Sequence, residues 1–121
     1  MGQNVPVDSP GLIALDVDGT ILHPGASMRP RVRAAIRAAV EAGAHVVITT
    51  GRTLLATRLV MEELGLEQGQ AICSNGAVHV DISNWEPIAV HTFDPQPAVR
   101  ALRAALPDLV MSVEKVGVGT W

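Results

Sequence analysis

The sequence predicts an α/β fold built on a parallel sheet, and three observations lead to this prediction. Short apolar runs rich in β-branched residues occur at residues 12–17, 44–50 and 70–77, as expected for buried strands. Two segments with helical periodicity, residues 28–43 and 53–64, separate these runs. Strand, helix, strand, helix, strand in this order is the unit of a right-handed parallel sheet.

The N-terminal part of the chain begins with a polar segment and then enters the first strand. Residues 1–10 lack the apolar core of a signal sequence and are expected to form a flexible leader. The apolar run "LIALDV" at 12–17 is expected to be covered on both faces. The helix over 28–43 has Pro30 in its first turn and Gly43 as its stop. Its apolar positions at helical spacing are Val32, Ile36, Ala39 and Val40.

The pattern changes after Ala77. Residues 78–93 alternate around the polar turn "SNWEP", which predicts an antiparallel hairpin. A helix is expected over 94–107, with Asp94 as its cap, because Val99, Leu102 and Leu106 share one face. Residues 109–118 have the composition of another strand. The switch near residue 80 therefore suggests a second module that has only begun.

Composition excludes several classes of function. A chain of 121 residues is long enough for one modest domain. The net charge of -3 and an aromatic content of 2% give no general reason to bind nucleic acid or an anionic membrane. No apolar stretch is long enough to span a bilayer. The single cysteine, Cys73, fits the core of a cytoplasmic protein and excludes an internal disulfide.

Polar motifs follow all three predicted strands of the parallel sheet. In open α/β sheets ligands bind outside the carboxyl ends of the strands, so these motifs are expected to converge on one rim. The rim residues are Asp16 and Asp18 after the first strand, Thr50, Gly51 and Arg52 after the second, and Ser74, Asn75 and Gly76 after the third.

The two aspartates are the strongest candidates for chemistry. If the chain bends after Asp16, its carboxylate and that of Asp18 can face one pocket, where hard oxygen ligands suit Mg²⁺. One aspartate can then attack phosphorus while the other moves a proton. Gly19 permits a sharp turn, and the hydroxyl of Thr20 can fix the loop. The alternative is that both aspartates only begin and cap a loop.

The other two motifs add a phosphate site. Thr50 offers a hydroxyl, Gly51 frees the backbone beside it, and the following helix N-terminus is a natural seat for phosphate. Arg52 can hold phosphate oxygens in a bidentate way. The alternative for "TTGR" is a simple capped helix start. Asn75 and Gly76 form first of all a turn, in which the Asn75 side chain can orient substrate or order the rim.

Other interpretations of the aspartates fit less well. An EF-hand loop needs a third oxygen ligand before its glycine and a closing glutamate, and "DVDGTILHPGAS" has neither. A D-x-D motif of the nucleotide-sugar transferase type leaves "TTGR" unexplained.

The set "DVDGT", "VVITTGR" and "SNGA" resembles the motifs of haloacid dehalogenase (HAD) superfamily phosphohydrolases, in particular the Cof-type branch. The resemblance implies a Rossmann-like doubly wound parallel sheet over residues 11–79, followed over 80–121 by the start of an α/β cap. It also implies an Mg²⁺-dependent phosphohydrolase that acts on a small phosphomonoester, such as a sugar phosphate, through an aspartyl-phosphate.

The same resemblance assigns roles to residues of the rim. Asp16 would be the nucleophile and a Mg²⁺ ligand. Asp18 would be the general acid/base, with its backbone carbonyl touching the metal. Thr50 would bind the transferring phosphoryl group. The remaining residues expected on the substrate and phosphate side are Gly19, Thr20, Gly51, Arg52, Asn75 and Gly76.

Two further elements of the family are not found in these residues. Members of the family also have a lysine and an acidic loop later in the chain. The one lysine of this sequence, Lys115, lies in the presumed cap and is not assigned that role. The chain is therefore expected to be the N-terminal portion of a longer enzyme or a truncated product. Without neighbours, the strand at 12–17 would be an exposed edge, which suggests a homodimer through that edge. The alternative function is an inactive fragment that binds phosphate or a partner chain.

Overall fold

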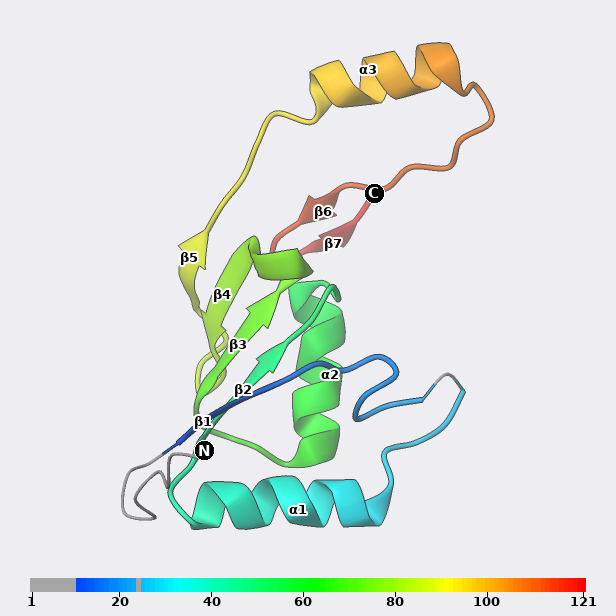
Figure 1. Ribbon diagram of the computed structural model, residues 1–121. Helices are drawn as coiled ribbons and strands as arrows, with labels where there is room; N and C mark the ends of the chain where they lie inside the picture. Colours follow the sequence, from blue (N-terminus) through cyan, green and yellow to red (C-terminus); the bar gives the residue numbers. More distant parts are fainter. Residues whose placement is uncertain (1–10, 24) are drawn as a thin grey trace, which may run out of the picture.

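The computed structural model describes residues 11–23 and 25–121, and its main feature is a five-stranded sheet with the order β1-β2-β3-β4-β5 (Figure 1). The predicted leader, residues 1–10, lies outside the described residues. Parallel pairing joins β1 (Leu12–Leu15), β2 (His45–Thr49) and β3 (Gln70–Cys73). An antiparallel hairpin of β4 (Val78–Asp81) and β5 (Pro87–Val90) continues the sheet. The predicted Rossmann-like α/β fold is confirmed.

Two helices connect the parallel strands, as predicted. Helix α1 (Pro30–Glu41) has Pro30 in its first turn. Helix α2 (Leu54–Leu64) begins after Thr53, whose side chain accepts a hydrogen bond from the Ala56 backbone N–H. It ends at Gly65, which adopts the left-handed conformation that glycine tolerates at a helix terminus.

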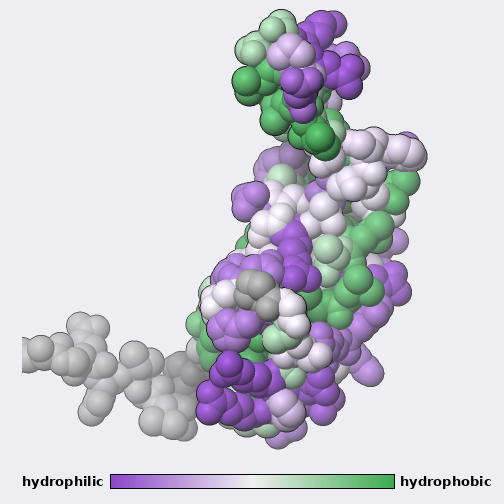
Figure 2. Space-filling model, turned by 90° about the vertical axis from the view of Figure 1, so that its right-hand side faces the viewer, coloured by the Kyte–Doolittle hydropathy of each residue, from purple (hydrophilic) through white to green (hydrophobic). Residues whose placement is uncertain are grey.

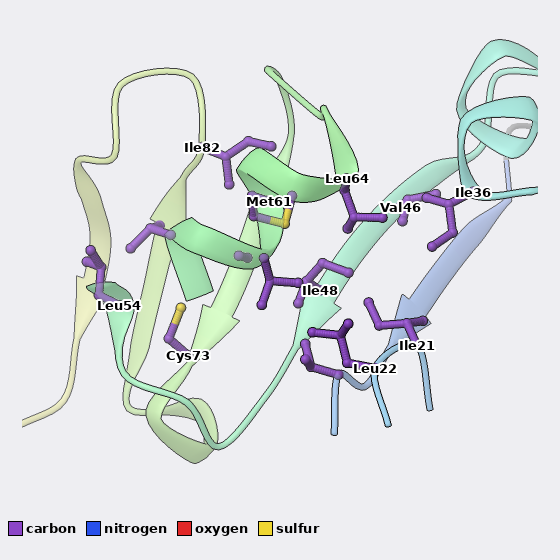
Figure 3. Close-up of a cluster of buried hydrophobic side chains, with 14 of the residues drawn as sticks. Ile21, Leu22, Ile36, Val46, Ile48, Leu54, Met61, Leu64, Cys73 and Ile82 are labelled. Atoms are coloured by element: carbon purple, nitrogen blue, oxygen red, sulfur yellow. The ribbon is translucent and has the colours of Figure 1, made fainter. Parts of the chain in front are cut away.

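The apolar core lies between these helices and one face of the sheet (Figure 3). Side chains from α2 interlock with side chains from the sheet, and Ile36 of α1 closes one end of the cluster. Cys73 is fully buried, as predicted, and burial raises the pKa of its thiol. The sheet contributes Val46, Ile48, Ala71, Cys73, Val78 and Val80, and α2 contributes Leu54, Val60, Met61 and Leu64.

The first strand departs from the prediction of a strand covered on both faces. It ends at Leu15 rather than at residue 17, and Leu12 and Ile13 are 71% and 37% exposed. The reason is its position in the sheet: within residues 11–23 and 25–121, β1 pairs with β2 alone. The expectation that it forms an exposed apolar edge is therefore confirmed.

The predicted boundary between residues 79 and 80 falls within β4. This strand pairs with β3 over four residue pairs, from Gln70 with Asp81 to Cys73 with Val78. The antiparallel hairpin, which the sequence places at the start of a second module, thus extends the same sheet that carries the candidate site.

The C-terminal part is more extended than the core. Helix α3 (Gln96–Ala105) stands clear of the sheet and has no buried residue, so apolar and polar side chains both face solvent (Figures 1 and 2). The N-cap residue is Pro95, one position after the predicted cap, Asp94. The Asp94 carboxylate still accepts a hydrogen bond from the Gln96 N–H at 3.0 Å and so binds the first N–H of the helix.

The prediction of a single strand over residues 109–118 is wrong. The structure has instead a short hairpin of β6 (Glu114–Lys115) and β7 (Gly119–Thr120). Gly117 has a φ of 74°, and the Val118 N–H donates to the Lys115 carbonyl at 2.9 Å. The chain turns there because glycine adopts positive φ at little cost.

Candidate active site

The bend on which the aspartate hypothesis depends is present. The Val17 carbonyl accepts hydrogen bonds from the N–H groups of Thr20, Ile21 and Leu22, at 3.3, 3.1 and 2.9 Å. Gly19 supplies the required left-handed residue, with a φ of 83°. Val17 is fully buried while Asp16 and Asp18 are exposed, so the turn anchors its apolar residue and presents both carboxylates at the surface.

Asp16 lies in a cleft at the carboxyl ends of the parallel strands. The cleft measures about 250 Å³. The Thr20 hydroxyl donates to Asp16 Oδ2 at 3.3 Å and so helps to orient the carboxylate. Residues from all three predicted motifs line the cleft: Asp16, Thr49, Thr50, Gly51, Ile72, Asn75 and Gly76.

Asp18 is paired with Arg52 from the next strand end. Arg52 Nε donates to Asp18 Oδ2 at 2.9 Å, and Nη2 donates to Oδ1 at 2.7 Å, which is a bidentate arrangement. Hydrogen bonding from the guanidinium lowers the pKa of Asp18 and raises that of Arg52. The Asp18 carboxylate therefore favours its ionised form, and Arg52 faces Asp18 rather than the cleft lining.

Thr50 connects the second motif to the third. This residue is 6% exposed, and its Oγ1 accepts a hydrogen bond from the Arg52 N–H at 3.1 Å. Its carbonyl accepts from the Asn75 N–H at 3.1 Å, while the Arg52 carbonyl accepts from the Ser74 N–H at 2.8 Å. The loops after β2 and β3 are thus held together by their backbones.

The turn Ser74–Gly76, here called the SNG turn, is conformationally strained. Ser74 and Asn75 have φ values of 52° and 55°, and a non-glycine residue in this region costs on the order of 1 kcal/mol. A Cβ built on Gly51 would lie 2.9 Å from Asn75 Oδ1. Glycine is therefore required at position 51 for the Asn75 side chain to lie where it does, against the cleft.

The N-terminus of α2, predicted as a phosphate seat, already has an anionic partner. Glu114 of β6 accepts a hydrogen bond from the Leu54 N–H at 3.1 Å through Oε1. Its other oxygen, Oε2, accepts from the Ser74 hydroxyl. Sequence reasoning missed Glu114, because it lies far along the chain from both partners and no local motif marks it.

All nine predicted site residues lie at this rim, five of them lining the cleft and four beside it. Asp16, Thr50, Gly51, Asn75 and Gly76 line the cleft. Beside it, Asp18 and Arg52 bind each other, Thr20 contacts Asp16, and Gly19 forms the turn.

The donor set at the rim is compatible with a hard cation. In the part of the chain that the structure describes, no group of three or more His, Cys, Asp or Glu residues is arranged to hold a metal ion. The cleft that Asp16 lines nevertheless also includes Thr49, Thr50 and Asn75, residues with side-chain oxygen atoms. Such ligands fit Mg²⁺, which commonly keeps several waters and takes only one or two carboxylates from the protein.

An aspartate pair, a threonine and an asparagine turn thus lie together at the ends of parallel strands. The chain belongs to the haloacid dehalogenase-like hydrolase family, whose profile matches residues 13–109. The predicted membership of the Cof-type branch of the superfamily is confirmed.

Two curated relatives are phosphatases. The chain is 37% identical over 92 residues to pyridoxal phosphate phosphatase YbhA of Escherichia coli, covering 76% of this chain and 32% of the relative. It is 44% identical over 66 residues to 5-amino-6-(5-phospho-D-ribitylamino)uracil phosphatase YcsE of Bacillus subtilis, covering 54% and 26%. The chain thus spans about a third or less of the length of these relatives.

Solved structures agree on the fold. A haloacid dehalogenase-like hydrolase from B. subtilis superimposes with a TM-score of 0.65 at 32% identity, covering 77% of this chain and 32% of the other. The HAD phosphatase BT1666 from Bacteroides thetaiotaomicron superimposes with a TM-score of 0.73 at 20% identity, covering 99% and 43%. None of the helices in the described residues has the length and apolar character needed to cross a membrane.

Proposed function

We propose that the protein is an Mg²⁺-dependent phosphohydrolase that cleaves a small phosphomonoester, such as a sugar phosphate, with Asp16 as nucleophile. One observation carries this proposal. The Asp16 carboxylate shares a cleft of about 250 Å³ with Thr50, Gly51 and Asn75, a set that can hold a phosphoryl group beside a nucleophile. The relatives named as phosphatases of phosphorylated metabolites support the substrate class.

In the first step an Asp16 carboxylate oxygen attacks phosphorus, and the bond from phosphorus to the ester oxygen breaks. The carboxylic acid of Asp18 donates its proton to the departing oxygen, so the alcohol leaves uncharged. Thr50 and the Gly51 backbone hold the phosphoryl oxygens. The product of this step is an aspartyl-phosphate on Asp16.

In the second step a water molecule attacks phosphorus and the bond to Asp16 breaks. The Asp18 carboxylate now accepts the proton of the water, which restores the acid for the next cycle. Inorganic phosphate leaves, and Asp16 is again a free carboxylate.

The Asp18–Arg52 pair adds a condition to the first step. While both guanidinium hydrogen bonds are made, the Asp18 carboxylate favours its ionised form and is a poor proton donor. A substrate phosphate is a competing bidentate partner for Arg52. Arg52 thus has two partners in turn, Asp18 before substrate binds and phosphate afterwards.

Asp16 through its carboxylate and Asp18 through its backbone carbonyl are the residues that would hold Mg²⁺. When bound, the cation would neutralise charge on the phosphoryl oxygens and keep the nucleophile ionised close to them. The buried Cys73 supports a cytoplasmic location, and the exposed strand β1 supports pairing with a second copy of the chain.

Hydrolysis of p-nitrophenyl phosphate with Mg²⁺ tests the proposal. We expect turnover by the wild-type chain and its loss in Asp16→Asn. Asp108→Asn, which changes an exposed aspartate away from the rim, is expected to keep wild-type turnover. Full activity of Asp16→Asn, or no activity in a folded wild-type chain, would contradict the proposal. The second result would favour an inactive phosphate-binding fragment.

A further inference from the structure

Glu114 is the point where the C-terminal segment meets the rim. Its Oε1 accepts from the Leu54 N–H at 3.1 Å, and its Oε2 accepts from the Ser74 hydroxyl. Leu54 is the first residue of α2, and Ser74 is the first residue of the SNG turn. One half-buried carboxylate therefore connects the two loops that follow β2 and β3 with β6.

These two hydrogen bonds have little support from other contacts. Within residues 11–23 and 25–121, no other hydrogen bond connects residues 112–121 with residues 11–91. Val116 packs against the edge of the core, and a largely apolar cleft of about 300 Å³ lies between the hairpin and the start of β4. The Glu114 carboxylate is consequently the main polar connection between hairpin and core.

The Glu114 connection ends on a strained segment, the SNG turn. Ser74 and Asn75 are both non-glycine residues at positive φ, a conformation that persists only where surrounding contacts hold it. The Ser74 N–H and the Asn75 N–H hold the turn from the backbone side. On the side-chain side, Glu114 binds Ser74, and Ser74 is the sequence neighbour of Asn75, which lines the Asp16 cleft.

We propose that Glu114 is a positioning residue: it holds the SNG turn and the start of α2 in place, and so couples the β6–β7 hairpin to the geometry of the candidate site. It touches no residue assigned to attack or proton transfer and acts through Ser74 and Leu54. That the held turn serves phosphate rests on the proposed function, whereas the coupling between hairpin and rim does not.

Amide hydrogen exchange tests the coupling directly. In Glu114→Ala we expect amide exchange to accelerate about fivefold or more at Leu54, at residues 74–77 and at residues 112–121. The reason is that the two hydrogen bonds from Leu54 and Ser74 to the Glu114 carboxylate are lost. Glu114→Gln, whose amide oxygen can still accept from Leu54, is expected to show a smaller effect. Glu67→Gln, a change at an exposed glutamate, is the matched control and should leave these segments unchanged.

Unchanged exchange at residues 74–77 and 112–121 in a folded Glu114→Ala chain would overturn the proposal. If this variant unfolds, exchange in β2 and β3 will accelerate as well, and Ser74→Ala then decides. It removes only the hydroxyl and should accelerate exchange at residues 74–77 and 112–121 while β2 stays protected. No change in Ser74→Ala would overturn the coupling.

Titration with inorganic phosphate and Mg²⁺ measures the consequence for the site. The probe is the amide chemical shift of Gly51 and Asn75. We expect Glu114→Ala to weaken phosphate binding about fivefold and Glu114→Gln to restore most of it. Tighter binding in Glu114→Ala would contradict a positioning role, because it would mean that Glu114 competes with phosphate at α2. No response in the wild-type chain would count against the proposed function, while the exchange result would still stand.

Discussion

Arg52 donates hydrogen bonds to both carboxylate oxygens of Asp18, from Nε at 2.9 Å and from Nη2 at 2.7 Å, although the two residues follow different strands. The hydrogen bonds lower the pKa of Asp18, and partial desolvation opposes this only in part. The residue proposed as proton donor is thus kept ionised by the residue proposed to meet the phosphate.

Arg52→Ala is predicted to raise the pKa of Asp18 towards its ordinary value of 3.8. Arg52→Lys should fall between, because an ammonium group keeps the charge but not the bidentate geometry. NMR titration of the Asp18 carboxyl carbon in metal-free protein measures this. An unchanged titration curve in Arg52→Ala would show that the pair does not control Asp18.

The same pair predicts a pH dependence of stability. A lowered folded-state pKa contributes stability that is present above 3.8, the ordinary value, and is lost as the pH falls through the lower value in the folded protein. The difference in Tm between wild type and Arg52→Ala should therefore be small at neutral pH, because Asp18 is exposed, and should vanish in acid. A difference that grows as the pH falls would have the wrong sign.

Gly51→Ala is predicted to displace the Asn75 side chain. The new Cβ would lie 2.9 Å from Asn75 Oδ1, and a short side chain can rotate away at a cost of about 1 kcal/mol. The Asn75 side-chain amide resonances should shift while the fold is kept. Combining the change with Asn75→Ala should remove most of the stability loss, and simple additivity of the two changes would argue against this contact.

Two leucines of α2 offer a matched test of the core. Leu64 is fully buried and Leu59 is 66% exposed. Leu64→Ala is predicted to lower the free energy of unfolding by about 2–5 kcal/mol, because it leaves a cavity. Leu59→Ala should change it by less than about 0.5 kcal/mol. Urea denaturation measures both, and similar values for the two variants would contradict the packing of α2.

How much of this was predictable depends on the range of the interaction. The burial of Val46 and Ile48 is predictable because it follows from a local apolar run. The end of α2 at Gly65 is predictable for the same reason, because a glycine directly after a helical segment is a local signal. The convergence of Asp16, Thr50 and Asn75 on one cleft was also predictable, because parallel strands end at the same edge of a sheet.

Other features depend on neighbours that no local pattern reveals. The apolar run at the first strand indicates burial, yet Leu12 is exposed because β1 has a partner on one side only. The carboxylate of Glu114 reaches Leu54 and Ser74 across 60 and 40 positions of sequence. The pairing of Asp18 with Arg52 likewise depends on side-chain geometry. For this reason the sequence alone assigns Arg52 to the substrate and does not reveal its pairing with Asp18.

The exposed strand predicts self-association. A copy of the chain that pairs with β1 would cover Leu12 and Ile13, so light scattering should detect a dimer whose population rises with concentration. Leu12→Lys should weaken it by placing charge on the edge. Val110→Lys, at a residue that is 93% exposed and far along the chain, is the control. A monomer at all concentrations would contradict pairing through β1.

The central claim is that Asp16 attacks phosphorus, and its most direct test is the mass of the peptide that contains Asp16 after reaction with p-nitrophenyl phosphate and Mg²⁺ followed by an acid quench. We predict the mass of one added phosphoryl group on that peptide in the wild-type chain and none in Asp16→Asn. Phosphate on another residue, or an unmodified peptide during demonstrable turnover, would contradict it.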